Sequence, residues 1–186
     1  PFVRAHLIYD QMFISQLFIL SPRGDKLVFK DYRQDAPGNS DEIFFRKYKF
    51  WDGRDHQAPA SGDCPPFFLE KHIHFSFIKR SNLLFVCTSL QNVSPSLTSE
   101  LLVRVVKVLK DFLGVISEES IRKNFVLVYE LLDEMLDVGV AQELSTERLR
   151  PYIFNEVVPC AAPEVQPQES LLERIRRGDF TSVTTR

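Results

Sequence analysis

The side chains in this chain that could bind a metal are a few histidines and a cysteine. His72 and His74 lie two residues apart in an alternating segment, so they would share one face of a strand, and His56 and Cys64 precede them in the sequence. Zn²⁺ takes such ligands in proteins, but this spacing misses the usual zinc patterns, and solvent-exposed strand histidines are the favoured interpretation. We therefore predict no metal site.

Catalytic chemistry would have to come from the same region, where Asp52, His72 and His74 form the one cluster worth testing. Cys87 lies in an apolar strand segment without a His and acid motif, so we expect a buried thiol rather than a nucleophile. The sequence holds no phosphate-binding glycine loop, dinucleotide fingerprint, nucleophile elbow or zinc-protease motif. We predict a protein that is not an enzyme, with no catalytic residues and no cofactor.

Charge and cysteine content narrow the class of partner. The 186 residues carry 23 basic and 25 acidic side chains, a net charge of -2, which supplies no general field for nucleic acid. Three widely spaced cysteines fit free thiols in a reducing compartment, so we expect a cytosolic chain. We find no signal peptide in residues 1–11 and no apolar run long enough for a bilayer span, so membrane association is expected to be indirect.

Hydrophobic patterning predicts five strands and a first helix. Residues 12–20 are apolar at nearly every position, which is typical of an interior strand covered on both faces. Turn-forming residues at 21–25 then predict a hairpin. A second strand is predicted to begin at Leu27, and three more are predicted over residues 67–70, 73–77 and 83–88. A helix is expected over residues 41–50, and a loop over residues 52–65.

Two long helices follow. Ser94 is the expected N-cap of the first, with Pro95 at its first position and Gly114 at its end. Ser117 should cap a second helix that continues to Gly139, and a short helix is expected near residues 149–154. We divide the chain into an extension (1–11), one domain (12–155), and a proline-bearing linker and tail (156–186) that leads to an absent carboxy-terminal domain.

The second long helix carries the strongest hint of function. Residues 125–132 contain one polar side chain, Glu130, so apolar groups project all round the helix axis and a second covering surface is required. The candidate partner-interface residues are Phe125, Val126, Tyr129 and Leu132. Tyr129→Ala is then predicted to weaken partner capture and to leave the fold intact.

Four stretches resemble a known family. They are residues 12–21 (MFISQLFILS) with Gly24 and Asp25 after them, 30–33 (KDYR), 92–95 (NVSP) and 124–137 (NFVLVYELLDEMLD). Residues 12–155 resemble the amino-terminal longin-like domain of adaptor-complex medium (mu) subunits. The opening segment and the run at 145–149 (STERL) are most similar to the mu subtype of the fourth adaptor complex.

The resemblance implies an α/β (α+β) longin/SNARE-like domain in which helices sandwich a five-stranded antiparallel sheet. It implies a non-enzymatic scaffold for vesicle-mediated protein transport, in a heterotetramer with large and small subunits and chiefly against a beta-type chain. The expected location is cytosolic, and peripheral on trans-Golgi network or endosomal membranes through the complex. In this family the cargo pocket lies in a separate carboxy-terminal domain.

Two alternatives share the expected fold. A longin-type trafficking regulator or SNARE should continue into a long heptad-repeat helix and usually a membrane anchor, and residues 156–186 show neither pattern. A small (sigma) adaptor subunit would end near residue 155, without the proline-bearing linker. The linker favours a medium subunit.

Overall fold

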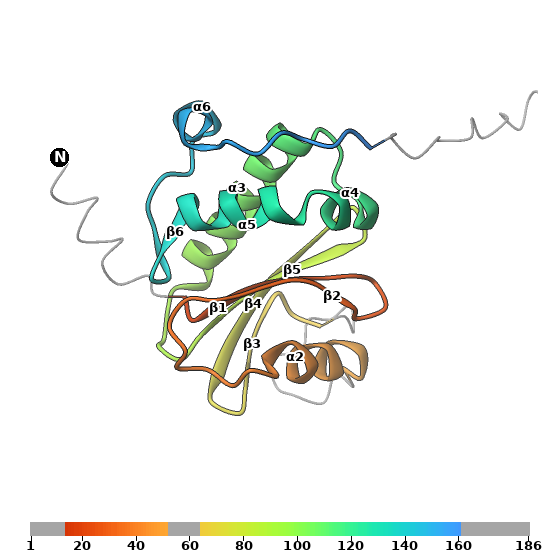
Figure 1. Cartoon of the computed structure of the whole chain (residues 1–186). Coiled ribbons are helices and arrows are strands. Elements are labelled where there is room, and N and C mark those ends of the chain that lie inside the picture. The colour runs from red at the N-terminus through yellow and green to blue at the C-terminus, as the bar shows by residue number, and fades with distance from the viewer. Residues whose placement is uncertain (1–13, 52–63, 161–186) are drawn as a thin grey trace, which may run out of the picture.

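The structure of the chain, a computed structural model, describes residues 14–51 and 64–160. The predicted extension at 1–11, most of the predicted loop at 52–65 and the tail from residue 161 therefore lie outside the described residues. The described residues form a mixed α/β domain in which helices cover both faces of a sheet. α2 lies on one face, and α3 and α5 lie on the other (Figure 1). This confirms the predicted fold class.

The sheet has five antiparallel strands in the order β2-β1-β5-β4-β3. The strands are β1 (Gln16–Leu20), β2 (Lys26–Asp31), β3 (Phe67–Glu70), β4 (Ile73–Arg80) and β5 (Leu83–Ser89). Short turns join β1 to β2, as the turn-forming residues at 21–25 predict, and also join β3 to β4 and β4 to β5, whereas α2 lies between β2 and β3. β1 lies between β2 and β5, so the predicted interior strand is confirmed.

Alternation along the strands divides the core between the two faces. In β1, Leu17 and Ile19 point toward α3 and α5, whereas Phe18 and Leu20 point toward α2, and all four are fully buried. The α2 face is rich in aromatic residues and consists of Phe18, Leu20, Phe44, Phe68, Ile73, Phe75, Phe77, Leu84 and Val86. A strand buried on both sides thus explains the nearly continuous apolar run.

The helix α2 (Ser40–Lys49) closes the aromatic face, and α3 (Pro95–Leu113) crosses the opposite face. Pro95 begins α3 and Gly114 ends it with a positive φ of 74°, both as predicted. Ser94 is the N-cap residue of α3, as predicted. No side-chain cap bond forms there, and the Ser94 carbonyl accepts the first helical bonds, from Leu97 and Thr98.

The second long helix is broken where one continuous helix was predicted. It consists of α4 (Glu118–Lys123) and α5 (Phe125–Met135), which meet at Asn124. Asn124 has non-helical torsion angles (φ -109°, ψ 27°), and its side chain bonds to backbone groups. Asparagine competes with helical hydrogen bonding in this way, which gives a physical reason for the break. The Ser117 side chain caps α4 as predicted, accepting from Ser120 N–H.

The chain after α5 forms a small hairpin that sequence patterning missed. The strands β6 (Leu136–Asp137) and β7 (Val140–Ala141) pair through a turn in which Val138 and Gly139 both have positive φ, so α5 ends before Gly139. Gly139 accepts a backbone hydrogen bond from Ile14, just before β1. A short helix α6 (Thr146–Leu149) and a 3-10 turn (Arg150–Tyr152) follow, close to the predicted short helix.

Candidate partner interface

The histidines do not form a metal site in the described part of the chain. His72 lies in the turn between β3 and β4 with φ 64°, so it does not share a strand face with His74, which corrects the expectation from spacing. The His74 ring stacks on Phe67 with centroids 5.6 Å apart. Within residues 14–51 and 64–160, no group of three His, Cys, Asp or Glu side chains could hold a metal ion. Asp52 and His56 lie outside the described residues.

Cys87, in β5, and Cys64, before β3, are poorly suited to nucleophilic chemistry. Burial raises the pKa of the Cys87 thiol to about 12, against a weaker lowering by a hydrogen bond from Ser76. Burial likewise raises the pKa of the half-buried Cys64 to about 11, against a weaker lowering by Lys47. A thiolate is the reactive form, and little of it is present near neutral pH at either site.

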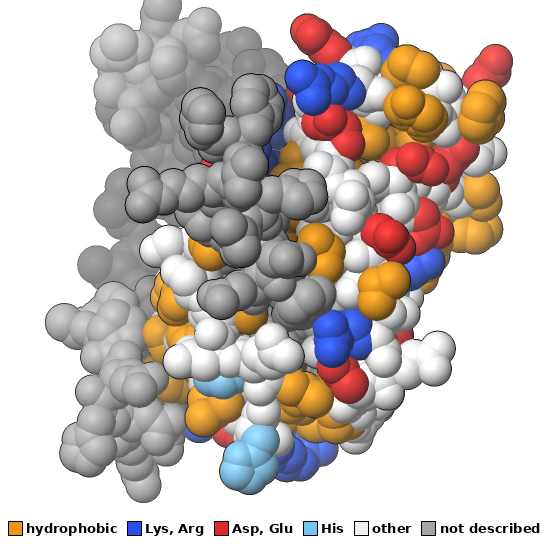
Figure 2. Space-filling view, turned by 90° about the vertical axis from the view of Figure 1, so that its left-hand side faces the viewer, with side chains coloured by type: hydrophobic (Ala, Val, Ile, Leu, Met, Phe, Trp, Pro, Cys, Tyr) orange, Lys and Arg blue, Asp and Glu red, His pale blue; other side chains and the backbone are white. Residues whose placement is uncertain are grey.

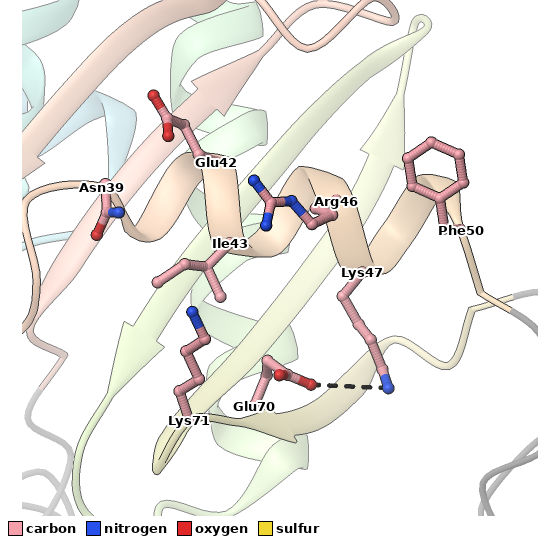
Figure 3. Close-up of a pocket in the computed structure, with 8 residues that line it drawn as sticks. All are labelled: Asn39, Glu42, Ile43, Arg46, Lys47, Phe50, Glu70 and Lys71. Carbon is pink, nitrogen blue, oxygen red and sulfur yellow. Dashed lines mark ion pairs between the residues drawn. The ribbon is translucent and has the colours of Figure 1, made fainter.

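A hollow of about 290 Å³ lies between α2 and the turn after β3, and most of the residues that line it are charged or polar. Figure 3 shows that Lys47 reaches across to Glu70, to which it is ion-paired at 3.6 Å, while the Phe50 ring points away from that pair. The lining residues are Asn39, Glu42, Ile43, Arg46, Lys47, Phe50, Glu70 and Lys71. None of them is a histidine, cysteine or serine, and opposite charges are mixed along the wall.

The four predicted interface residues on α5 fall into three environments. Leu132 is fully buried in the core shared with α3, so this side chain is not available on the surface of the domain, which corrects its selection. Tyr129 is half-buried against the same core. Phe125 and Val126 are 53% and 49% exposed. The partner interface itself stays a prediction, now confined to the exposed pair.

Tyr129 completes the hydrogen bonding of the outer edge of β2. Its hydroxyl accepts from Phe29 N–H and donates to Phe29 C=O, each at 3.1 Å. Because β2 is an edge strand, these two backbone groups have no neighbouring strand on that side. Tyr129 therefore belongs to the sheet, and its replacement by alanine is not expected to leave the fold unaffected.

The KDYR segment holds the same edge against α5. Lys30 forms an ion pair with Asp133, and the Tyr32 hydroxyl donates to the Leu132 carbonyl at 3.2 Å. Burial, and next the Asp133 carboxylate, raises the pKa of Tyr32 well above its ordinary value, which keeps the phenol protonated as a donor. Part of the second covering surface that α5 requires is thus the edge of its own sheet.

We expect Tyr129→Phe to lower the free energy of unfolding by about 1–3 kcal/mol, because it leaves a part-buried N–H and C=O of Phe29 without their partner. Chemical denaturation followed by circular dichroism measures this loss, and amide exchange at Phe29 should quicken. Tyr152→Phe is the matched control, since the Tyr152 side chain is exposed. Equal stabilities of the two variants would contradict the edge role.

Phe125 and Val126 form the apolar centre of the surface at the start of α5. The preceding helix α4 carries ion pairs between Glu118 and Arg122 and between Glu119 and Lys123. Figure 2 shows the other side of the molecule, toward the end of α5, and there hydrophobic side chains of the described residues are interspersed with acidic and basic ones. An apolar centre with a charged rim is the usual composition of a protein interface.

Comparisons with known proteins place this geometry in a family. The model of the family described as "Clathrin adaptor complex small chain" matches residues 13–155. The AP-4 complex subunit mu of Arabidopsis thaliana is 50% identical over 176 residues, which cover 93% of this chain and 38% of that protein. The AP-4 complex subunit mu-1 of Homo sapiens is 44% identical over 147 residues, 78% of this chain and 30% of that protein.

A structural likeness agrees with the fold. A chain of a homology model of the full-length AP-3 complex in a stretched open conformation matches with a TM-score of 0.54 and 14% identity, over 73% of this chain and 88% of that chain. The chain spans little more than a third of the length of the Arabidopsis relative and less of the human one. Since the family match covers well over half of this sequence, the chain belongs to the clathrin adaptor complex small-chain family.

Proposed function

We propose that this chain is the amino-terminal domain of an AP-4 mu-type subunit and works as a non-enzymatic scaffold in vesicle-mediated protein transport. The similarity to proteins named AP-4 complex subunit mu, at 50% and 44% identity, supports this proposal. The domain itself would comprise residues 12–155. The cargo-binding part would lie elsewhere in the whole protein.

We propose further that the domain docks onto a large beta-type subunit through the surface around Phe125 and Val126. The observation that carries this is the exposure of both side chains on a helix whose leucines, Val128 and Met135 are buried. Burial of such an aromatic group at the centre of an interface contributes strongly to binding. In the described part of the chain, no helix combines the length and apolar character needed to cross a bilayer. Attachment to trans-Golgi network or endosomal membranes from the cytosol would come through the complex.

The experiment that tests this proposal is a cytosolic pull-down with the tagged 186-residue chain, with mass spectrometry of the proteins retained after a moderate salt wash. We expect recovery of a large beta-type adaptor subunit. In the variant Phe125→Ala/Val126→Ala, binding of that subunit should fall by about tenfold or more, as for an interface hot spot. The variant itself should fold normally, since both side chains are largely exposed.

Val103→Ala is the matched control, because Val103 is 46% exposed on the neighbouring α3 and lies outside the proposed surface. Its recovery of the beta-type subunit should equal that of the unchanged chain. Retention of SNAREs or a small GTPase alone would instead support a longin-type trafficking regulator. Undiminished capture by the double variant would place the docking surface elsewhere on the domain.

A further inference from the structure

The segment that follows the last short helix is bound along the outside of α4 and α5. In Figure 1 it runs from α6 across the helical layer toward α4. Its far end is held by Asn124, which is buried at the junction of the two helices. The Asn124 side chain accepts from Val158 N–H at 2.7 Å and donates to Val158 C=O at 3.0 Å. An amide that pairs both ways with one residue's backbone reproduces the pairing of a β-ladder.

A second anchor lies six residues further along the helix. One carboxylate oxygen of Glu130 accepts from Phe154 N–H at 3.0 Å, and the other accepts from Asn155 N–H at 3.2 Å and from the Asn155 side chain at 2.8 Å. Burial works to raise the pKa of Glu130, but these hydrogen bonds outweigh it and hold the pKa below its ordinary value. The carboxylate is therefore charged, and hydrogen bonds to a charged acceptor are the stronger kind.

Two side chains of the segment face inward, four residues apart. Ile153 and Val157 pack against the main core, whereas residues 154–156 and Val158 are exposed, Phe154 to 84%. Two half-buried aliphatic side chains and two polar anchors are few contacts compared with those of the sheet and α3. Regions with few buried contacts open locally without unfolding of the whole domain.

We propose that residues 153–158 form a latch, a segment that engages α4 and α5 as one unit and releases as one unit. When the latch is engaged, the chain leaves the domain beside Asn124. When it is released, the chain leaves from the turn at Tyr152, and the following polypeptide gains up to about 20 Å of free tether. The latch thus sets both the reach and the direction of whatever follows it, next to the surface around Phe125 and Val126.

Residue-resolved amide exchange of the 186-residue chain tests this directly. In the unchanged protein the amides of Phe154, Asn155 and Val158 should exchange more slowly than that of Glu156, for which the structure shows no acceptor. Glu130→Ala should speed exchange at Phe154 and Asn155 by about tenfold or more. It should also speed exchange at Val158, which Glu130 does not touch, because the latch opens as a unit.

Glu134→Ala is the matched control, an exposed carboxylate on the same helix, and it should leave all three amides unchanged. Asn124→Ala should release the segment from the other end, but it could also alter the junction of α4 and α5, because Asn124 bonds to Ser120 as well. Glu130→Ala leaves that junction intact, so it tests the latch by itself. Fast exchange at the three amides in the unchanged chain would overturn the proposal. Release of Phe154 and Asn155 without Val158 would overturn the single unit. Neither measurement requires a partner, so failure of the latch is distinguishable from failure of the docking proposal.

A spin label reports the exit point itself. Cys160 follows the latch, two residues after Val158, whose backbone bonds to Asn124 at the end of α4. The substitution Cys64→Ser removes one accessible thiol, and Cys87 is buried. Among the described residues, a nitroxide label should therefore attach to Cys160. The label should broaden amide signals of α4 strongly, and Glu130→Ala should weaken that broadening. Equal broadening in both proteins would contradict a change of exit point.

Discussion

We expect Phe44→Ala to lower the free energy of unfolding by about 3–5 kcal/mol, the range for truncating a fully buried aromatic side chain. Phe44 is the buried aromatic side chain of α2, and it packs into the aromatic face of the sheet. It is 0% exposed to solvent. Its ring lies 5.3–6.0 Å, between centroids, from the rings of Phe18, Tyr48, Phe68, Phe75 and Phe77. Denaturant unfolding monitored by circular dichroism gives the loss.

The matched control is Phe50→Ala, which removes the same side chain one residue beyond the end of the same helix. Phe50 is 73% exposed, so its removal should change stability by no more than about 0.5 kcal/mol. Because α2 and α5 lie on opposite faces of the sheet, Phe44→Ala tests the scaffold without altering the proposed docking surface. Similar losses in the two variants would mean that the aromatic cluster does not hold α2 to the sheet.

The five strands could be predicted because their signals are local. The apolar run at residues 12–20, the turn-forming residues from Ser21 to Asp25, and the alternation at Ile73, Phe75 and Phe77 are each signals carried by neighbouring residues. Cross-strand pairing then follows from short turns, because consecutive strands joined by a short turn pair antiparallel. The interior place of β1 was predictable for the same reason, since both of its faces are apolar.

The helix break at Asn124 could not be predicted from periodicity. Apolar residues recur at helical spacing across the junction from Ile121 to Val128, and both are buried. At the interruption, the Asn124 side chain pairs with the backbone of Val158, 34 residues away, a contact that periodicity cannot reveal. A polar asparagine inside an apolar helical pattern is the one local signal of this site, and it is a weak one.

Of the four candidate interface residues, sequence patterning could not tell which side chains are exposed, because exposure depends on tertiary contacts. An apolar helix reveals that several surfaces must cover it, but not which of its sides its own domain covers. The Leu132 side chain is buried in the core, and the Tyr129 hydroxyl is hydrogen-bonded to Phe29 at the edge of β2. What remains for a partner, Phe125 and Val126, is known only after those tertiary contacts are in place.

We expect Gly139→Ala to lower the free energy of unfolding by about 3 kcal/mol or more, because it combines backbone strain with a steric clash. Gly139 has φ 80°, a conformation that costs an L side chain energy. A Cβ at this position would also overlap the carbonyl oxygen of Ile14, where the hairpin of β6 and β7 bonds to the chain entering β1. Thermal and denaturant unfolding measure the loss.

Gly114→Ala separates the two causes. Gly114 has nearly the same φ, 74°, but no atom lies within 4 Å of the position of its Cβ, so strain alone should cost about 1 kcal/mol. The difference between the two variants isolates the close approach of the hairpin to Ile14. That contact ties the end of α5 to the start of β1, so its loss should also quicken amide exchange at Ile14. Equal losses in the two glycine variants would show that the hairpin is not held there, and that other contacts of α5, such as those with β2 and α3, position it.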